Sequence, residues 1–338
     1  MVKRCLVYPV RCIISGYMIL DGFDLGVGIL HPFIAKTDEE RRIDLNSIGP
    51  IWDGNEVWLI LGGGALFAAF PFSVCLALFS GAYTAMMLVL LAFILRTVAI
   101  EFRSKREAYL ADSVGLGVLH RLVPHRPAAW RRLRQCHAGL PIDENGNMWA
   151  TLFDMLTPFT LLLGVTTVFM VATHGAMFLI MKTEGEQQDR LRRLAPILMI
   201  IFFVLNTIIV LMIAFTHEDI LSNYLTRIWP IIFPAGALAA VLVSYYFLRQ
   251  EKYFPAFIAS GAMIALLIFA AAAGMYPNLL FSTIDPAYNL TIFNSASAPN
   301  TLVVMLVIAL IGMPFVLLYT AGVYYFFRGK VQLDPTSY

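Results

Sequence analysis

Long apolar runs constrain this chain more than any other feature of its sequence. A helix that crosses about 30 Å of hydrocarbon needs about 20 consecutive apolar residues, and the 338-residue sequence contains several such runs. Hydrophobic residues make up 59% of the chain and charged residues only 14%, which is more apolar surface than one soluble core of this length could bury. The chain is therefore predicted to be all-α: a polytopic transmembrane helical bundle that forms one integral membrane domain over residues 1–338.

Eight spans are visible in the sequence. The first, residues 5–20, is short and is interrupted by Pro9 and Arg11. No small-residue cleavage site follows its basic start, so we interpret it as a span and not as a removed signal. The seven clearer spans are residues 56–74, 75–95, 152–180, 194–215, 229–248, 254–275 and 302–327.

The basic loops indicate that one span is missing from this count. Loops rich in Lys and Arg stay on the cytoplasmic side of a membrane, so residues 103–106 and 182–193 should be separated by an even number of crossings. Only residues 152–180 form a visible span between them, and the interval 104–139 carries an anomalous basic segment instead. Such a segment is either a long cytoplasmic loop or a stretch in which a reading-frame shift has replaced a natural fourth span. We favour the second, because apolar runs resume at both ends; the same origin would explain the poor residues 1–16.

Carboxylates within apolar spans are costly unless they are paired or hydrated, so each is a candidate for function. The first cluster, Asp21-Gly-Phe-Asp24-Leu-Gly-Val-Gly28, places two acids at i and i+3 on one helical face. Its glycines would allow another helix to approach closely. The cluster lacks the alternating oxygen ligands of a calcium loop. For Asp21 and Asp24, fixing a turn at the membrane edge and handling protons are both open roles.

The second cluster, Trp52-Asp53-Gly-Asn55-Glu56-Val-Trp58, opens the next span. It again has acids at i and i+3, and it leads into Gly62-Gly63-Gly64, a further close-packing surface. An Asp at a helix N-terminus often serves as a cap, and a carboxylate at the membrane border can also carry protons. Asp53 can therefore be a cap, a proton carrier or both.

No residue pattern indicates a metal or covalent scaffold. His174 lies in mid-span, where it could ligate haem or relay protons, but a hydrogen-bonded packing histidine is the preferred interpretation. The four cysteines form neither a Cys-x-x-Cys pair nor a zinc-binding spacing. The sequence has no Walker A, HExxH or Rossmann motif, and its net charge of +2 gives no indication of a nucleic-acid partner.

Several motifs together resemble subunit II of the cytochrome bd-type ubiquinol oxidases, including the cyanide-insensitive branch. The resemblance covers residues 17–105 and 139–338. Its motifs are Tyr-Met-Ile-Leu-Asp-Gly-Phe-Asp-Leu-Gly-Val-Gly at residues 17–28, Glu-Glu-Arg-Arg at 39–42, the Trp-Asp-Gly-Asn-Glu-Val-Trp stretch within 46–59, and residues 63–70, with shorter landmarks at 101–105 and 182–186.

The resemblance implies a role in a two-subunit terminal oxidase that oxidises quinol and reduces dioxygen to water in aerobic respiration. In that family subunit I ligates the haems, of types b and d, and holds the quinol site, so this chain is expected to bind no cofactor itself. The expected partners are subunit I in a heterodimer and membrane lipid, with a small accessory subunit left open. The family has nine spans in the bacterial inner (plasma) membrane, and its fourth span falls where the parity argument places the missing one.

The resemblance also implies roles for individual residues. Asp53 matches the acid to which the family assigns proton transfer towards the oxygen-reducing haem, with Asn55 and Glu56 surrounding it. Trp58 matches an aromatic residue near the oxygen route. A structural role at the subunit interface is expected for the first cluster and the neighbouring glycines: Asp21, Asp24, Gly22, Gly26, Gly28 and Gly63.

Two other functions remain open on the residues alone. A secondary transporter or ion channel would bind a coupling cation at intramembrane carboxylates such as Asp24 and Asp53. Transporters usually show internal repeats with helices broken in mid-membrane, and the two halves of this chain show no corresponding interrupted segments. A purely structural subunit would stabilise its partner without conducting protons.

Overall fold

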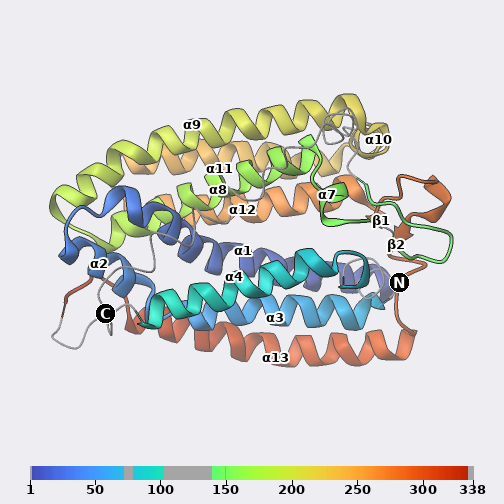
Figure 1. The fold of residues 1–338 in the computed structure, drawn as a ribbon, viewed down its shortest axis with the longest axis horizontal. Helices are drawn as coiled ribbons and strands as arrows, with labels where there is room; N and C mark the ends of the chain where they lie inside the picture. Colours follow the sequence, from blue (N-terminus) through green and yellow to red (C-terminus); the bar gives the residue numbers. More distant parts are fainter. Residues whose placement is uncertain (1, 72–78, 103–138, 149, 334–338) are drawn as a thin grey trace.

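The protein is a bundle of long helices that run roughly parallel or antiparallel to one another (Figure 1). The computed structural model describes residues 2–71, 79–102, 139–148 and 150–333. The long helices in that part of the chain are α1 (Val2–Ile34), α3 (Trp52–Ala69), α4 (Tyr83–Phe102), α8 (Pro158–Lys182), α9 (Gly185–Thr216), α11 (Ile232–Arg249), α12 (Tyr253–Met275) and α13 (Pro299–Phe326).

Short elements connect the long helices at the two ends of the bundle (Figure 1). At one end α2 (Asp38–Ile48) joins α1 to α3. At the other end a small antiparallel pair of strands, β1 (Asn278–Leu280) and β2 (Leu290–Thr291), lies between α12 and α13. The remaining short elements are α7 (Leu152–Met155), α10 (Glu218–Thr226) and two 3-10 turns, η3 (Trp229–Ile231) and η4 (Pro286–Tyr288).

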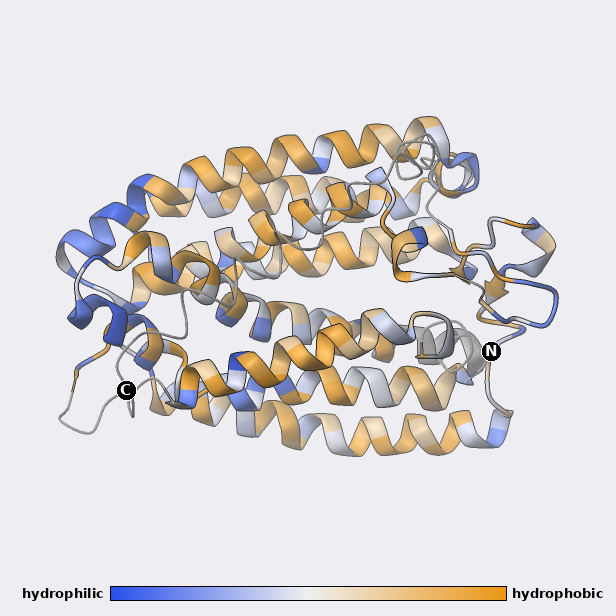
Figure 2. Ribbon diagram, in the orientation of Figure 1, coloured by the Kyte–Doolittle hydropathy of each residue, from blue (hydrophilic) through white to orange (hydrophobic). Residues whose placement is uncertain are grey.

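Seven of the described helices are long and apolar enough to cross a membrane, which confirms the helical membrane bundle (Figure 2). Their apolar parts are Pro9–Ile34, Tyr83–Glu101, Pro158–Lys182, Gly185–Thr216, Trp229–Arg249, Tyr253–Met275 and Pro299–Phe326. The eighth predicted span corresponds to α3, which lies beside α1 and α13. It is less apolar because its first five residues include Asp53, Asn55 and Glu56.

The prediction for the first span was wrong in its extent. The sequence placed it at residues 5–20 and left open a turn at Asp21 and Asp24, whereas α1 continues as one helix to Ile34. Pro9 lies within this helix, and the Asp-Gly-Phe-Asp segment occupies its middle instead of a membrane edge. The segment stays helical because its two carboxylates find polar partners on neighbouring helices, as the next section describes.

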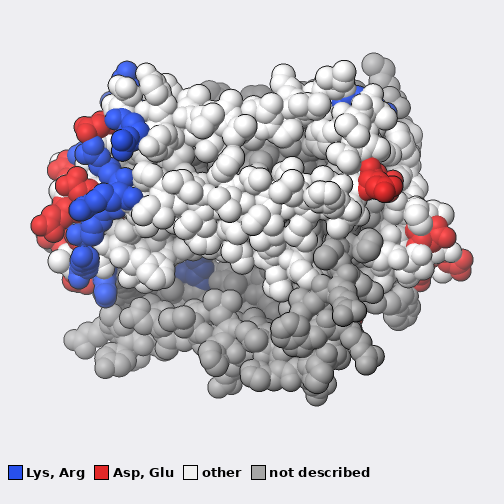
Figure 3. Space-filling view, turned by 90° about the horizontal axis from the view of Figure 1, so that it is seen from above, with Lys and Arg blue, Asp and Glu red and all other residues white. Residues whose placement is uncertain are grey.

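Charged residues gather mainly at one end of the bundle. Figure 3 shows Lys and Arg side chains beside the apolar belt, with acidic side chains farther out at the tip. Lys182 ends α8 and Arg249 ends α11 at this end. Phe102 ends α4 at this basic end, and Leu140 lies at the opposite end, bridged to Ser282 (Figure 1). The anomalous segment 104–139 and the fourth span predicted there fall, apart from residue 139, outside the described residues.

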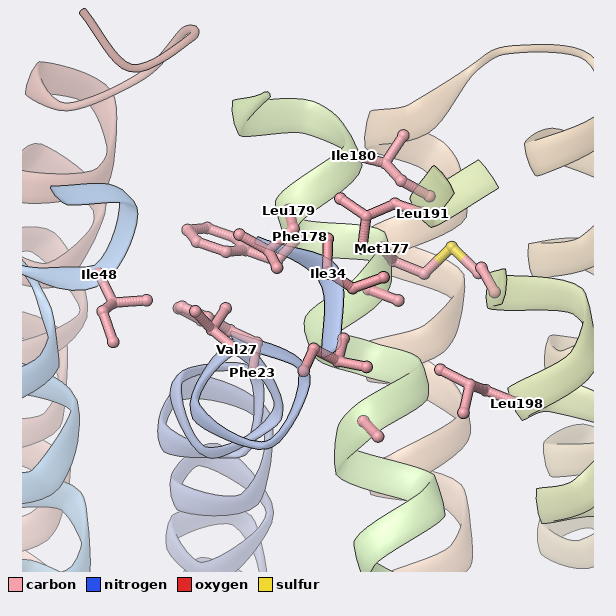
Figure 4. Packing of buried hydrophobic residues seen from close by; sticks show 14 of the residues in the cluster. Phe23, Val27, Ile34, Ile48, Met177, Phe178, Leu179, Ile180, Leu191 and Leu198 are labelled. Carbon is pink, nitrogen blue, oxygen red and sulfur yellow. The ribbon is translucent and has the colours of Figure 1, made fainter. Parts of the chain in front are cut away.

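The core forms where α1 crosses α8. Phe23, Val27, Leu30 and Ile34 recur at helical spacing along one face of α1 and are all buried. They pack against side chains of α8 such as Phe178, whose ring stacks on Phe23 with ring centres 4.2 Å apart (Figure 4). Burial of this stripe holds α1 between α8 and α12 on one side and α3 and α13 on the other.

Two glycines make the α1–α8 crossing possible. A Cβ atom at Gly26 would lie 2.0 Å from the carbonyl oxygen of Val171, and one at Gly175 would lie 2.5 Å from the carbonyl carbon of Gly26. Both backbones therefore occupy space that any side chain would need. The close-packing role that the sequence predicted for Gly26 agrees with this geometry.

We expect Gly26→Ala to destabilise the chain, because the new methyl group would force two backbones apart. Overpacking of this kind typically costs about 1–3 kcal/mol. Gly28→Ala is the matched control, since a Cβ there meets nothing within 4 Å and Ala favours a helix over Gly by up to about 1 kcal/mol. Thermal unfolding of the purified protein in detergent measures both. Equal melting midpoints for the two variants would contradict the close contact of the α1 and α8 backbones at Gly26.

Candidate functional site

Two buried carboxylates lie in the middle of α1. Asp21 is fully buried and Asp24 is 1% exposed, so neither reaches solvent or lipid. Their i and i+3 spacing turns both towards α3 and α4. Asp21 lies 12 residues after the apolar part of α1 begins at Pro9, or about 18 Å along the helix at 1.5 Å per residue. The pair therefore sits deep in the membrane-spanning part of the bundle.

Arg96 of α4 is the cation that meets these acids. Its Nη2 lies 2.7 Å from Asp21 Oδ1 and 4.0 Å from Asp24 Oδ2. The guanidinium carbon also lies 5.9 Å from the ring centre of Trp52, at the start of α3. Most of the surrounding side chains of α4 are exposed, so the ion pair is the main polar attachment of α4 to α1 among the described contacts.

Asn55 extends the polar contacts from α1 to α13. Its amide donates a hydrogen bond to Asp24 Oδ2 over 2.8 Å, and its carbonyl oxygen accepts one from the Tyr324 hydroxyl, also over 2.8 Å. Asn55 is 2% exposed. Four helices, α1, α3, α4 and α13, thus meet around one polar cluster, which we call the acid cluster: Tyr17, Asp21, Asp24, Asn55, Glu56, Arg96 and Tyr324.

The motif that opens α3 divides between two faces of the helix. Asn55 and Trp58 are buried, whereas Asp53 and Val57 are exposed and Glu56 is half-buried. Asp53 is the second residue of α3, and Ile51 occupies the N-cap position without a side-chain hydrogen bond. Asp53 is therefore no N-cap residue, although an acid in the first turn interacts favourably with the helix dipole. Asp53 interacts electrostatically with Glu56, at the edge of the acid cluster, but lies on the exposed face of α3.

Trp58 packs inward against α1. A Cβ atom at Gly16 would lie 2.5 Å from the Trp58 ring, so the indole fills the space that this glycine leaves open. Glu56 lies close enough to Arg96 and Asp21 to interact with both electrostatically. Asn55 and Glu56 were predicted to surround Asp53, but both face the acid cluster instead.

The predicted interface glycines differ in what surrounds them. Gly26 lies at the α1–α8 crossing, and a Cβ at Gly22 would make ordinary contact with Val171 at 3.7 Å. Gly28 and Gly63 have nothing within 4 Å of such a Cβ. For Gly63, packing against another chain therefore stays a prediction.

His174 is a packing residue of the α1–α8–α12 core. Its Nδ1 lies 2.6 Å from the Ser260 hydroxyl and its Nε2 lies 3.1 Å from the carbonyl oxygen of Ile19. The imidazole is fully buried and stacks on Phe257 with ring centres 4.7 Å apart. Both ring nitrogens are engaged, which agrees with the preferred interpretation of this histidine and leaves neither free to ligate haem.

A second polar cluster ties α2 to α9 at the basic end. Asp44 is fully buried; His31 Nδ1 lies 3.2 Å from its Oδ2, and Gln187 donates a hydrogen bond to its Oδ1 over 2.8 Å. Beside it, Glu40 forms an ion pair with Arg190. These contacts join α2, which contains the 39–42 landmark, to the first turns of α9, directly after the 182–186 landmark.

The carboxyl groups of this second cluster titrate differently. Burial raises the pKa of Asp44, although hydrogen bonds from His31 and Gln187 act against it. For Glu40, burial also raises the pKa, but hydrogen bonds from the Lys36 backbone and the Arg190 side chain outweigh it, so the net pKa is lowered.

Sequence reasoning missed Arg96 and Tyr324. A single arginine in the apolar run of α4 is a signal that could have been used, because an ionisable residue in a span needs a partner. Tyr324 gave no such signal, since tyrosines near the ends of spans are common. Among the described residues, no three His, Cys, Asp or Glu side chains are grouped so that they could hold a metal ion.

Comparisons with known proteins agree on one family. A family model described as cytochrome bd terminal oxidase subunit II matches residues 6–125 and 126–327. The cytochrome bd ubiquinol oxidase subunit 2 of Bacillus subtilis (strain 168) is 34% identical over 335 residues, covering 97% of this chain and 97% of the relative. The cytochrome bd-I ubiquinol oxidase subunit 2 of Escherichia coli (strain K12) is 35% identical over 359 residues, covering 96% and 94%.

A solved structure shares the fold. The bd oxidase from Geobacillus thermodenitrificans contains a chain that superposes with a TM-score of 0.70, covering 96% of this chain and 98% of that one. Its sequence identity is 16%, so this likeness concerns the arrangement of the helices. The family match begins at residue 6 and includes all of residues 104–139, with a division between residues 125 and 126; the nature of that segment stays a prediction.

Tyr324→Phe should destabilise the bundle, because it removes the donor to the buried carbonyl oxygen of Asn55. An unsatisfied buried acceptor costs about 1–3 kcal/mol. The matched control is Tyr325→Phe, at the next position of α13, where the side chain is 65% exposed. The free energy of unfolding in detergent should fall for the first variant and stay within error for the second. A null effect at Tyr324 would show that the hydrogen bond carries no net stability.

The Asp44 carboxyl should make stability depend on pH. Its pKa is raised in the folded chain, so the folded state keeps a proton that the unfolded state, with a pKa of about 3.9, has already lost. Its contribution to stability is therefore complete below that value and is lost as the pH rises through the raised pKa.

Asp44→Asn tests this dependence. The melting midpoint of the native chain relative to this variant should decrease as the pH rises from about 4 towards neutrality. Glu39→Gln, at an exposed position of the same helix, controls for a general charge effect. A relative midpoint that increases with pH for Asp44→Asn would reverse the sign and reject the prediction.

Proposed function

The chain belongs to the cytochrome bd terminal oxidase subunit II family, and on this premise we propose that it supports a haem-bearing subunit I and supplies it with protons and oxygen. The chain is a multi-pass membrane protein and a subunit of an oxygen-reducing oxidoreductase complex; membership of this family disfavours the transporter or channel alternative. The finer proposal is a heterodimer with subunit I in the bacterial inner membrane, with quinol as the electron donor and a small accessory subunit left open.

We assign haem b and haem d to subunit I. His174, the histidine that the sequence placed in mid-span, supports that assignment. His174 uses both ring nitrogens inside the core, His31 contacts Asp44, and the ring of His217 packs edge-on against Phe159. The contacts of His174 leave no ring nitrogen for a haem iron. No step of the chemistry is placed on this chain's own residues beyond proton and oxygen access.

The exposed face of α3 is the proposed contact for subunit I. Asp53, Val57, Ile60, Gly64 and Phe67 recur at helical spacing along it and are exposed in the isolated chain. The neighbouring helices α4 and α13 are also poorly covered, with only 6% of their apolar windows buried. A stripe that begins with an acid and continues with apolar side chains suits a protein partner inside the membrane better than lipid alone.

Asp53 carries the proton proposal. Reduction of dioxygen consumes protons at a buried site, and a carboxylate with access to water can relay them through apolar surroundings. Asp53 is exposed, lies at the basic end of the bundle in the first turn of α3, and begins the proposed contact face. Its exposure on the face that would meet the haem-bearing subunit is the observation that carries this role.

Trp58 is proposed to border the oxygen route. Its ring is 5% exposed and lies against Gly16 of α1. One helical turn farther along α3, a Cβ at Gly62 would contact the side chains of Ile13 and Ile14. Dioxygen is apolar and favours such surroundings over the polar start of α3.

Co-purification tests the partnership. We expect a tag on this chain, co-expressed with a bd-type subunit I, to recover a complex whose reduced-minus-oxidised spectrum contains the bands of haem b and haem d. Recovery of this chain without haem would contradict the proposed assembly.

In that complex, Asp53→Asn should keep the haem bands and lower quinol oxidase turnover, because removal of a proton-transferring group typically costs about 10²–10⁴-fold in rate. Asp219→Asn is the matched control, since Asp219 is also an exposed acid in the first turn of a helix. Unchanged turnover of Asp53→Asn would leave the chain with a structural role only.

A further inference from the structure

The acid cluster contains more negative than positive groups. Two carboxylates, Asp21 and Asp24, face a single guanidinium, that of Arg96, and all three belong to membrane-spanning helices. Glu56 on α3 adds a third acid at the edge of the cluster. If every group were ionised, the buried pair and Arg96 alone would carry a net charge of −1 inside the hydrocarbon layer.

No other charge on the surrounding helices balances this excess among the described residues. The remaining ionisable groups that face the acids are two phenols, Tyr17 from α1 and Tyr324 from α13. From α8 and α12 the side chains packed on Phe23, which lies between the two acids, are the rings of Phe178, Phe257 and His174. Both ring nitrogens of His174 are bonded to Ser260 and to the Ile19 backbone, not to the acids. A buried charge without a counter-ion is costly enough that the group takes up a proton instead.

The two carboxylates are not equivalent. Asp21 Oδ1 lies 2.7 Å from Arg96, which suits an ionised carboxylate. Asp24 lies farther from the guanidinium, at 4.0 Å, and its Oδ2 accepts a hydrogen bond from the uncharged Asn55 amide. A negative charge on Asp24 would therefore be less well compensated than one on Asp21. The other oxygen of Asp24, Oδ1, is buried and, like both oxygens of Asp21, has no hydrogen-bond partner among the described residues. The short contact with Arg96 is what distinguishes Asp21.

We propose that the acid cluster is a proton-binding site, in which Arg96 neutralises Asp21 and Asp24 holds one proton on Oδ1 in the resting protein. Asn55 and Tyr324 are positioning residues of this site: Tyr324 fixes the Asn55 amide, which in turn fixes the neutral carboxyl group. The cluster can therefore release or take up one proton within the bundle when the charge around Arg96 changes. The site is separate from Asp53 and does not depend on its proposed role.

Isotope-edited infrared spectroscopy of the purified oxidase complex tests the proposal. Aspartate labelled with ¹³C at the side-chain carboxyl identifies the carbonyl stretch of protonated Asp and separates it from Glu, and exchange into D₂O shifts that stretch. Asp24→Asn should remove one such band from the native spectrum. An unchanged band intensity would overturn the proposal.

Two further variants test the assignment of Arg96. Asp21→Asn should also abolish the band, because Arg96 is then free to neutralise Asp24. Arg96→Gln should increase the intensity of the protonated-aspartate stretch by about the equivalent of one further acid, since both carboxyls would then bind protons. A band that persists in Asp21→Asn, or that weakens in Arg96→Gln, would show that Arg96 does not set the protonation of the pair.

Matched variants separate the change in the infrared band from effects on assembly of the complex and from the proposed role of Asp53. Arg96→Lys preserves the charge and should leave the band intensity unchanged, and Asp53→Asn should leave it unchanged as well. If Arg96→Gln does not assemble with its partner, the isosteric variants Asp21→Asn and Asp24→Asn still decide the question. Turnover is not the readout, so loss of the Asp53 role would leave this result intact.

Discussion

The ion pair between Asp21 and Arg96 is the contact on which the arrangement of helices around the polar face of α1 depends. A carboxylate in the middle of a hydrocarbon layer must meet a partner from the same protein, because neither water nor lipid can solvate it there. Asp21 and Asp24 therefore dictate what surrounds α1: an arginine on α4, an amide on α3 and, through that amide, a phenol on α13. Three helices are oriented about their own axes by one polar cluster.

On its other side α1 is held by shape instead of charge. Gly26 and Gly175 let the backbones of α1 and α8 touch, and the stripe that includes Phe23 and Val27 fills the space next to this crossing. Van der Waals contact between small residues is the main attraction available to helices in lipid, where burial from water contributes little. Polar pairing on one face and close packing on the opposite face together place α1 in the centre of the bundle.

The two faces of α3 differ in what they contact. The inward face of α3 carries Asn55 and Trp58, which complete the interior of the chain, while its outward face carries Asp53 and an apolar stripe. If subunit I holds the haems, as proposed, this chain acts through contact with that subunit. One face of α3 stabilises the fold of this chain, and the other carries the acid for which we propose a role towards the partner.

The sequence alone determined that this chain is a helical membrane protein, where most spans lie, and which motifs tie it to its family. Those properties follow from runs of apolar residues and from short motifs, both of which are local in the chain. The sequence did not show that α1 continues through Asp24, because a polar segment ends a hydropathy window whether or not its charges are paired. Asp21 and Arg96, Asn55 and Tyr324, and Asp44 and Gln187 meet only through packing. Only the tertiary structure decided these pairings and the outward position of Asp53, because both depend on how each helix is rotated about its own axis. The sequence leaves that rotation open, since a membrane helix that is apolar on nearly all sides has no clear apolar face.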